Sequence, residues 1–96
     1  MKQENCLKYF SHDACSVCKV LFPKVKQLLE EDFPMMELIF IDLEKRPEEA
    51  ARHQVFTAPT LLVFFEGKEY YRFARNVSLP QLKTAIERPY QLLFQP

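Results

Sequence analysis

The pattern of apolar and polar positions along the chain predicts seven secondary-structure elements. Four short apolar or alternating runs are typical of β-strands, at residues 6–10, 38–41, 61–65 and 69–74. Helical spacing or helix-start signals mark three further segments, one from Cys15 or Ser16 to Phe33, one after Arg46-Pro47, and one from Ser78 to Pro89. The expected order of elements is therefore βαβαββα.

The longest of these helices carries its apolar side chains on one stripe, at spacings of three, four and seven residues. The stripe consists of Val17, Val20, Leu21, Val25, Leu28 and Leu29, and it predicts the face that packs on the core. Pro23 lies inside the same helix and is expected to bend its axis, because proline removes one backbone hydrogen bond. Met35, Met36 and the phenylalanines are also assigned to the core.

The connections between the predicted strands define a topology. The run at 38–41 is continuously apolar, which predicts a central strand covered on both faces. A strand, a long helix and a second strand give a right-handed parallel crossover, and a turn at Gly67 adds an antiparallel hairpin. We therefore expect one α/β domain over residues 1–96, with a four-stranded mixed sheet and helices on both faces.

The balance of charges argues against several classes of partner, and the number of cysteines indicates the kind of chemistry and compartment. Thirteen lysines and arginines balance thirteen aspartates and glutamates, so no basic surface favours nucleic acid or an anionic membrane. No apolar run reaches the roughly 18 residues of a membrane span, and residues 1–5 lead into no apolar secretory segment. Three cysteines are too few for a disulfide scaffold and indicate redox or metal chemistry in a reducing compartment. We expect a cytoplasmic protein.

The cysteine pair Cys15 and Cys18 carries the clearest chemical signal. It lies after a strand and at the start of a helix, where free N–H groups and the positive end of the helix dipole lower the pKa of Cys15. Cys18 follows one turn later, close enough for a disulfide. Such a pair attacks a substrate disulfide through Cys15 and releases the product by attack of Cys18.

Other interpretations of these residues stay open. The two cysteines could only pack, or His12 could join Cys15 and Cys18 as a metal ligand, although a closed zinc site requires four ligands. His12 could instead stabilise the Cys15 thiolate through a hydrogen bond or its charge. Cys6 is expected in the core rather than as a third redox partner, and no function is predicted for His53.

Further features, taken with these cysteines, resemble the thioredoxin family. Lys19 follows the second cysteine, Pro23 stands five residues after it, and Thr57–Thr60 (TAPT) precedes a buried strand in the manner of the family's cis-proline loop. Gly67 matches the family's hairpin glycine. The resemblance covers residues 6–88 and implies a thioredoxin-like fold without the family's additional N-terminal strand and helix.

The resemblance implies a thiol–disulfide oxidoreductase. The Ala58–Pro59 bond would be cis, and Thr57, Ala58 and Pro59 would present backbone groups to an extended substrate beside Cys15. Protein or small-molecule disulfides would be the substrates, and a thioredoxin reductase or a small thiol would supply the electrons. No organic cofactor and no metal are expected, because the dithiol itself carries the electrons.

Several positions depart from the family pattern. The family's buried carboxylate falls at Tyr9 and its partner lysine at Leu38, and a phenol with a pKa of about 10 is a poor base. Tyr9 and His12 are the candidates for tuning the pKa of the dithiol. The family's groove glycine is replaced by Ala74 or Arg75, and Arg75 either stabilises the thiolate or obstructs a protein substrate. These departures support the alternative of a thioredoxin-fold binding or redox-sensing module.

The last residues, 89–96, are expected to form an apolar tail after the final helix. This segment contains Tyr90, Leu92, Leu93 and Phe94. The tail would fold back over the sheet edge that the absent N-terminal elements leave bare, and a dimer or partner contact is the alternative.

Overall fold

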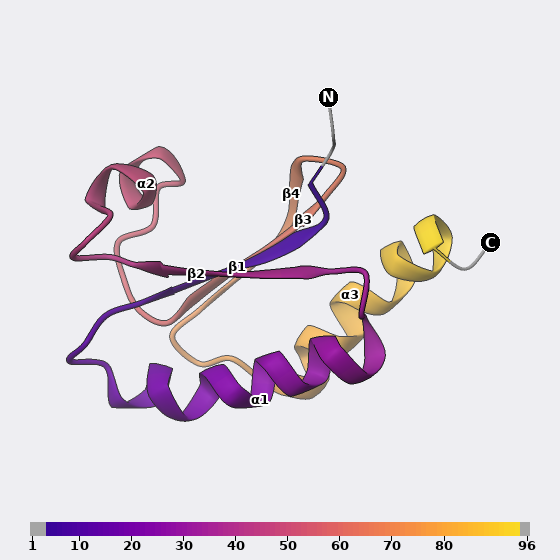
Figure 1. Ribbon diagram of the computed structural model, residues 1–96, viewed down its shortest axis with the longest axis horizontal. Helices are drawn as coiled ribbons and strands as arrows, with labels where there is room; N and C mark the ends of the chain where they lie inside the picture. Colours follow the sequence, from indigo (N-terminus) through magenta and orange to yellow (C-terminus); the bar gives the residue numbers. More distant parts are fainter. Residues whose placement is uncertain (1–3, 95–96) are drawn as a thin grey trace.

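The computed structural model describes residues 4–94 and contains seven elements in the expected order (Figure 1). The strands are β1 (Cys6–Ser11), β2 (Glu37–Asp42), β3 (Thr60–Phe65) and β4 (Lys68–Ala74). The helices are α1 (Ser16–Asp32), α2 (Pro47–Arg52) and α3 (Leu79–Phe94). The order βαβαββα is confirmed.

The strands form one mixed sheet in the order β2-β1-β3-β4. β1 runs parallel to β2, with α1 as the crossover between them, whereas β3 runs antiparallel to both β1 and β4. Glu66 and Gly67 in the β3–β4 turn have positive φ angles of 54° and 79°. A two-residue hairpin turn that matches the twist of the strands requires this left-handed backbone, which glycine adopts without a steric penalty.

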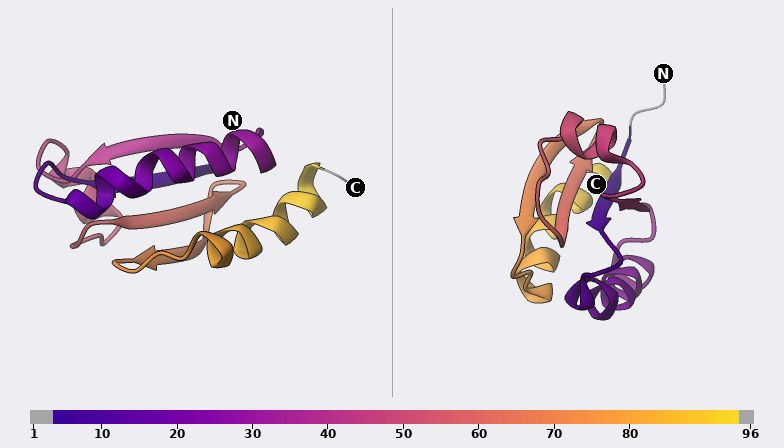
Figure 2. Two further views of the ribbon diagram at one scale, coloured as in Figure 1. Left: turned by 90° about the horizontal axis from the view of Figure 1, so that it is seen from below. Right: turned by 90° about the vertical axis from the view of Figure 1, so that its left-hand side faces the viewer.

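Helices cover both faces of the sheet, as expected, with α1 and α3 on one face and α2 on the other (Figure 2). Successive residues of a strand point to opposite faces, so β1 and β3 contribute to two cores. The core under α1 and α3 includes Leu7, Tyr9, Leu61, Val63, Val25, Leu29, Leu82 and Ile86. The core under α2 includes Cys6, Phe10, Leu62, Phe64, Ala50 and Val55.

The prediction of a central strand at residues 38–41 is wrong, because β2 lies at an edge of the sheet. Ile41 is buried, but Phe40 is 51% exposed. The exposed ring still contacts other aromatic side chains, since it stacks on Tyr9 with ring centroids 6.2 Å apart and meets Phe22 edge-on at 5.3 Å. A continuous apolar run therefore arises here from an edge strand whose side chains keep contacts on both faces.

The predicted end of the last helix at Pro89 is also wrong, because α3 continues through this proline to Phe94. Tyr90 accounts for the continuation. Its ring is buried against Phe33, with centroids 5.1 Å apart, and its hydroxyl accepts the Met35 N–H at 3.1 Å. These contacts offset the helical hydrogen bond that proline removes. Residues 95 and 96 of the expected tail lie outside the described residues.

The apolar stripe of α1 is only partly buried. Of the stripe residues, only three are buried in the core, namely Leu21, Val25 and Leu29. Cys18 completes the buried face, whereas Val17 and Val20 are 58% and 60% exposed. At about 100° per residue, Val20 lies roughly 140° from the centre of the buried face. Met35 and Phe56 are exposed as well, so their assignment to the core is corrected.

Candidate active site

The two cysteines lie where the loop after β1 meets α1. Cys15 is the N-cap residue of the helix, with extended backbone angles (φ −92°, ψ 96°), and its Sγ accepts the Cys18 N–H at 3.1 Å. Cys15 and Cys18 form a disulfide with their Cα atoms 5.3 Å apart. Cys15 is half-buried, whereas Cys18 is 1% exposed. Another molecule can therefore approach the sulfur of Cys15 more easily than that of Cys18.

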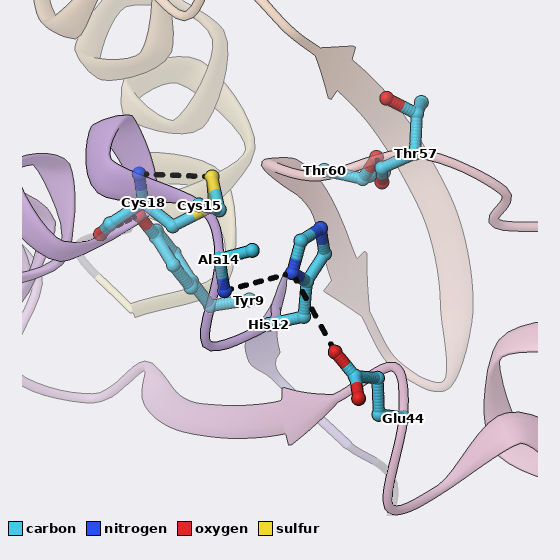
Figure 3. The surroundings of a disulfide bond; sticks show 8 residues. All are labelled: Tyr9, His12, Ala14, Cys15, Cys18, Glu44, Thr57 and Thr60. Carbon is cyan, nitrogen blue, oxygen red and sulfur yellow. Dashed lines mark hydrogen bonds and ion pairs between the residues drawn. A yellow bond between two sulfur atoms is a disulfide. The ribbon is translucent and has the colours of Figure 1, made fainter.

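His12 holds the turn that precedes the helix. Its carbonyl oxygen accepts the Cys15 N–H, and its Nδ1 accepts the Ala14 N–H, both at 3.1 Å. Glu44 Oε1 lies 3.8 Å from the same Nδ1 (Figure 3). A neutral imidazole whose Nδ1 accepts a hydrogen bond carries its proton on Nε2. His12 thus belongs to the turn that positions Cys15.

Tyr9 lies beneath the first turn of α1. Its hydroxyl donates to the Cys18 carbonyl oxygen at 2.7 Å, and its fully buried ring meets Phe22 edge-on with centroids 5.2 Å apart. Burial raises the pKa of Tyr9 to about 12. The phenol is therefore neutral over the physiological range and acts as a hydrogen-bond donor to α1 rather than as a base.

The loop between α2 and β3 reaches the same end of the sheet as the segment that carries the dithiol. Phe10 near the end of β1 pairs with Thr60 at the start of β3, so the two connecting segments meet at one end of the sheet. The Ala58–Pro59 peptide bond is cis. The Thr60 hydroxyl donates to the Thr57 carbonyl oxygen at 2.6 Å, and both threonines are labelled in Figure 3. Ala58 and Cys15 pack against the same core.

Arg75 joins this end of the sheet through its backbone. Its N–H donates to the Pro59 carbonyl oxygen at 2.9 Å, and its φ is 66°. The exposed side chain lines a shallow hollow together with Val17 and Leu21 of α1 and residues 76–78. Arg75 therefore connects the Pro59 loop with the first turn of α1.

Two other candidates lie away from the dithiol, in the region under α2. Cys6 is a free thiol that is fully buried there, and burial raises its pKa to about 11, which opposes thiolate chemistry. His53 accepts a hydrogen bond from Lys8 Nζ at 3.1 Å on the same face. No group of three His, Cys, Asp or Glu side chains within residues 4–94 is placed to hold a metal ion.

Sequence reasoning missed two contacts of this site, the hydrogen bond from Tyr9 to Cys18 and the one from Arg75 to Pro59. Both hydrogen bonds join segments that come together only in the folded sheet, so no local sequence pattern predicts them. It also placed Val17 and Val20 in the core. The signal that identifies the buried face correctly is the spacing of Cys18, Leu21, Val25 and Leu29, which is helical without either valine.

A disulfide-forming cysteine pair at the N-terminus of a helix, beside a cis-proline loop on an α/β sheet, defines a dithiol-exchange protein. The thioredoxin family model matches residues 1–88, and the chain belongs to the thioredoxin family.

Individual relatives agree with this assignment. The chain is 38% identical over 84 residues to the thioredoxin-like protein YdfQ of Bacillus subtilis, a match that covers 88% of this chain and 74% of that protein. It is 31% identical over 77 residues to thioredoxin 1 of Chlorobaculum tepidum, covering 80% and 76%. The solved structure of thioredoxin 1 from Thermosipho africanus superimposes with a TM-score of 0.83 at 33% identity, over 92% and 97% of the two chains. The thioredoxin-like fold is confirmed.

Family membership and the Cys15–Cys18 pair make the chain a thiol–disulfide oxidoreductase. Enzymes of this class exchange electrons with disulfide substrates and with a reductant. These comparisons give no support to the alternative of a binding or sensing module. Within the described part of the chain, no helix is both long enough and apolar enough to cross a membrane.

Proposed function

We propose that the chain reduces disulfides by attack of Cys15 and resolution by Cys18. The observation that carries this assignment is the difference in exposure, since Cys15 is a half-buried N-cap residue and Cys18 is 1% exposed. The Cys18 N–H, 3.1 Å from Cys15 Sγ, and the positive end of the α1 dipole both stabilise a thiolate at Cys15.

The reaction proceeds in two exchanges. The Cys15 thiolate attacks one sulfur of the substrate disulfide, forms a mixed disulfide and expels the other substrate sulfur as a thiolate, which takes up a proton. Cys18, as its thiolate, then attacks Cys15 Sγ, closes the Cys15–Cys18 disulfide and expels the second substrate thiolate. The substrate gains two electrons and the protein loses two.

The loop at Thr57, Ala58 and Pro59 is the proposed binding site for the substrate backbone. Thr57 and Ala58 are half-buried at the end of the sheet that carries the dithiol, and an extended segment pairs with free backbone groups as an added strand does. Arg75 adds a positive charge at the same end. His12 keeps the turn before Cys15 in place through the Ala14 and Cys15 amides.

The proposed substrates are protein or small-molecule disulfides. A thioredoxin reductase or a small thiol returns the electrons, as the resemblance to the family implies, and the reaction needs no organic cofactor and no metal. The cytoplasm is the proposed site of action, because a reducing compartment keeps such a dithiol in the reduced form that attacks disulfides.

An insulin-type disulfide reduction assay with dithiothreitol as reductant tests the two roles. We expect Cys15→Ser to lower the rate to the dithiothreitol background. With pre-reduced Cys18→Ser and no dithiothreitol present, we expect a mixed disulfide between Cys15 and the substrate to accumulate, which intact and peptide mass spectrometry locate. Cys6→Ser is the matched control and should retain the wild-type rate, since Cys6 is buried under α2. Activity in Cys15→Ser, or trapping on Cys18 in place of Cys15, would contradict the proposal.

A further inference from the structure

The first two turns of α1 expose an apolar face beside the dithiol. Val17, Val20, Leu21 and Lys24 are spaced by three, four and seven residues, so they share one face of the helix. Val17 and Val20 are 58% and 60% exposed. These two exposed valines, close in the chain to a reactive sulfur, form an apolar surface that another molecule can cover.

This face is hollowed on both sides of Val17. One hollow of about 320 Å³ lies between Val17, Leu21 and residues 75–78. A second hollow of about 360 Å³ is lined by Ser16, Val17, Val20, Leu21 and Lys24. The two hollows share Val17 and Leu21, so they lie next to each other at the start of the helix. We call the pair of hollows the α1 groove.

The α1 groove adjoins both parts of the active site. Ser16 and Val17 line the groove and follow Cys15 directly in the chain, so the groove begins one residue after the cysteine that forms the mixed disulfide. The opposite rim is fixed to the substrate-binding loop, because the Arg75 N–H donates to the Pro59 carbonyl oxygen at 2.9 Å. A peptide attached through its cysteine to Cys15 therefore has its neighbouring residues at this groove.

The charges around the α1 groove have one sign. Arg75 lies at one end and Lys24 at the other, and no acidic side chain of residues 4–94 lines either hollow. Within the same residues, neither Arg75 nor Lys24 takes part in any of the ion pairs at 4.0 Å or less. Glu44 lies on the other side of the site, against His12 (Figure 3). Both cations are thus available to a bound molecule.

We propose that the α1 groove selects protein disulfides whose reacting cysteine has apolar neighbours in the chain and acidic residues beyond them. This inference rests on the proposed function of Cys15 and specifies its substrate class. Apolar substrate side chains cover Val17 and Val20, and carboxylates pair with Arg75 and Lys24. The rise along α1 from Cys15 to Lys24 is about 13 Å, which an extended peptide spans with about four residues. The acidic residue that meets Lys24 is therefore expected about four positions from the cysteine.

Three peptides test this selectivity, each with one cysteine in a disulfide with 2-mercaptoethanol. One carries valines next to the cysteine and glutamates beyond them, the second replaces the glutamates by lysines, and the third replaces the valines by serines. With dithiothreitol as reductant at low ionic strength, kcat/KM for the first should exceed that for the second by about tenfold, as two exposed ion pairs provide. Added salt should reduce this ratio, because it screens exposed charges.

Variants assign the effect to the groove. The double variant Lys24→Gln with Arg75→Gln should bring the ratio between the first two peptides close to one. Val20→Ser should reduce the preference for the first peptide over the third. Lys68→Gln is the matched control, since Lys68 begins β4 at the end of the sheet opposite the dithiol, and it should keep the wild-type ratios.

The outcomes separate this inference from the proposed function. Equal rates for the three peptides, or a charge preference that survives in the double variant, would overturn the selectivity of the α1 groove while the exchange chemistry stands. Failure to reduce any of them, together with failure on the uncharged disulfide of 2-mercaptoethanol, would overturn the function on which the inference rests.

Discussion

The buried hydroxyl of Tyr9 allows a direct measurement of how the sheet supports the dithiol. It lies 2.7 Å from the Cys18 carbonyl oxygen, and the side chain is fully buried. Tyr9→Phe removes the donor and keeps the ring. The Cys18 carbonyl still accepts its helical N–H, so the variant loses one hydrogen bond without an orphaned polar group. We expect the free energy of unfolding to fall by about 0.5–1.5 kcal/mol. For a domain of this size, each kcal/mol lowers Tm by about 4–8 °C.

Urea and thermal unfolding of the oxidised protein, followed by circular dichroism, measure this loss. The matched control is Tyr71→Phe, because the side chain of Tyr71 is exposed on β4 and the substitution is chemically the same. Burial raises the pKa of Tyr9 to about 12 and the unfolded phenol titrates near 10, so the phenol keeps its proton in both states and the loss should be the same between about pH 6 and pH 8. Equal stability of the two variants would refute the reasoning, as would a loss that disappears within this range.

Three further predictions test other contacts. Lys8 donates to His53 at 3.1 Å, and burial followed by the Lys8 charge lowers the pKa of His53. The unfolded chain then binds the proton more tightly, so stability falls as pH drops below about 6.5, and His53→Gln should flatten that part of a urea-unfolding pH series. If His53→Gln leaves the pH dependence of the unfolding free energy unchanged, this prediction is contradicted. The Arg72 guanidinium donates to two backbone carbonyls at the end of α2, so Arg72→Lys should lower the free energy of unfolding by about 1 kcal/mol in thermal unfolding. An unchanged free energy of unfolding in this variant would contradict the prediction. Val25→Ala should cost about 2 kcal/mol and Val20→Ala less than about 0.5 kcal/mol in the same assay, and equal losses would contradict their different burial.

The parts of the fold that sequence could predict are those with a local cause. The seven elements follow from periodicity, and the hairpin follows from Gly67, whose positive φ suits a tight turn. The location of the disulfide also follows locally, because a strand-to-helix junction places a cysteine pair with this spacing on the first turn of a helix. The backbone hydrogen bonds of the helices and of the β3–β4 hairpin lie within short stretches of chain, whereas those that join β1 to β2 and β3 do not.

The errors concern properties that depend on neighbours in space. β2 contains the same kind of apolar run as a central strand, yet its place at the edge depends on whether another strand pairs with it. Pro89 is compatible with a helix end or a helix interior, and the contact of Tyr90 with Phe33 determines which occurs. A one-dimensional pattern contains neither contact. The hydrogen bonds of Tyr9 and Arg75 to the active site were missed for the same reason.

The misplaced valines of α1 show how such an error bears on function. Helical spacing groups Val17 and Val20 with the core residues, because an apolar side chain on a helix is ordinarily buried. The sheet takes up only the face of Cys18, Leu21 and Val25, and the two valines stay exposed. Water contact with these side chains costs free energy that burial would recover, at about 25 cal/mol for each Å² of apolar surface. On the proposal for the α1 groove, a substrate that covers them recovers that free energy both before Cys15 attacks and in the mixed disulfide that Cys18 resolves. On the same proposal, their exposure favours substrate binding throughout the two exchanges.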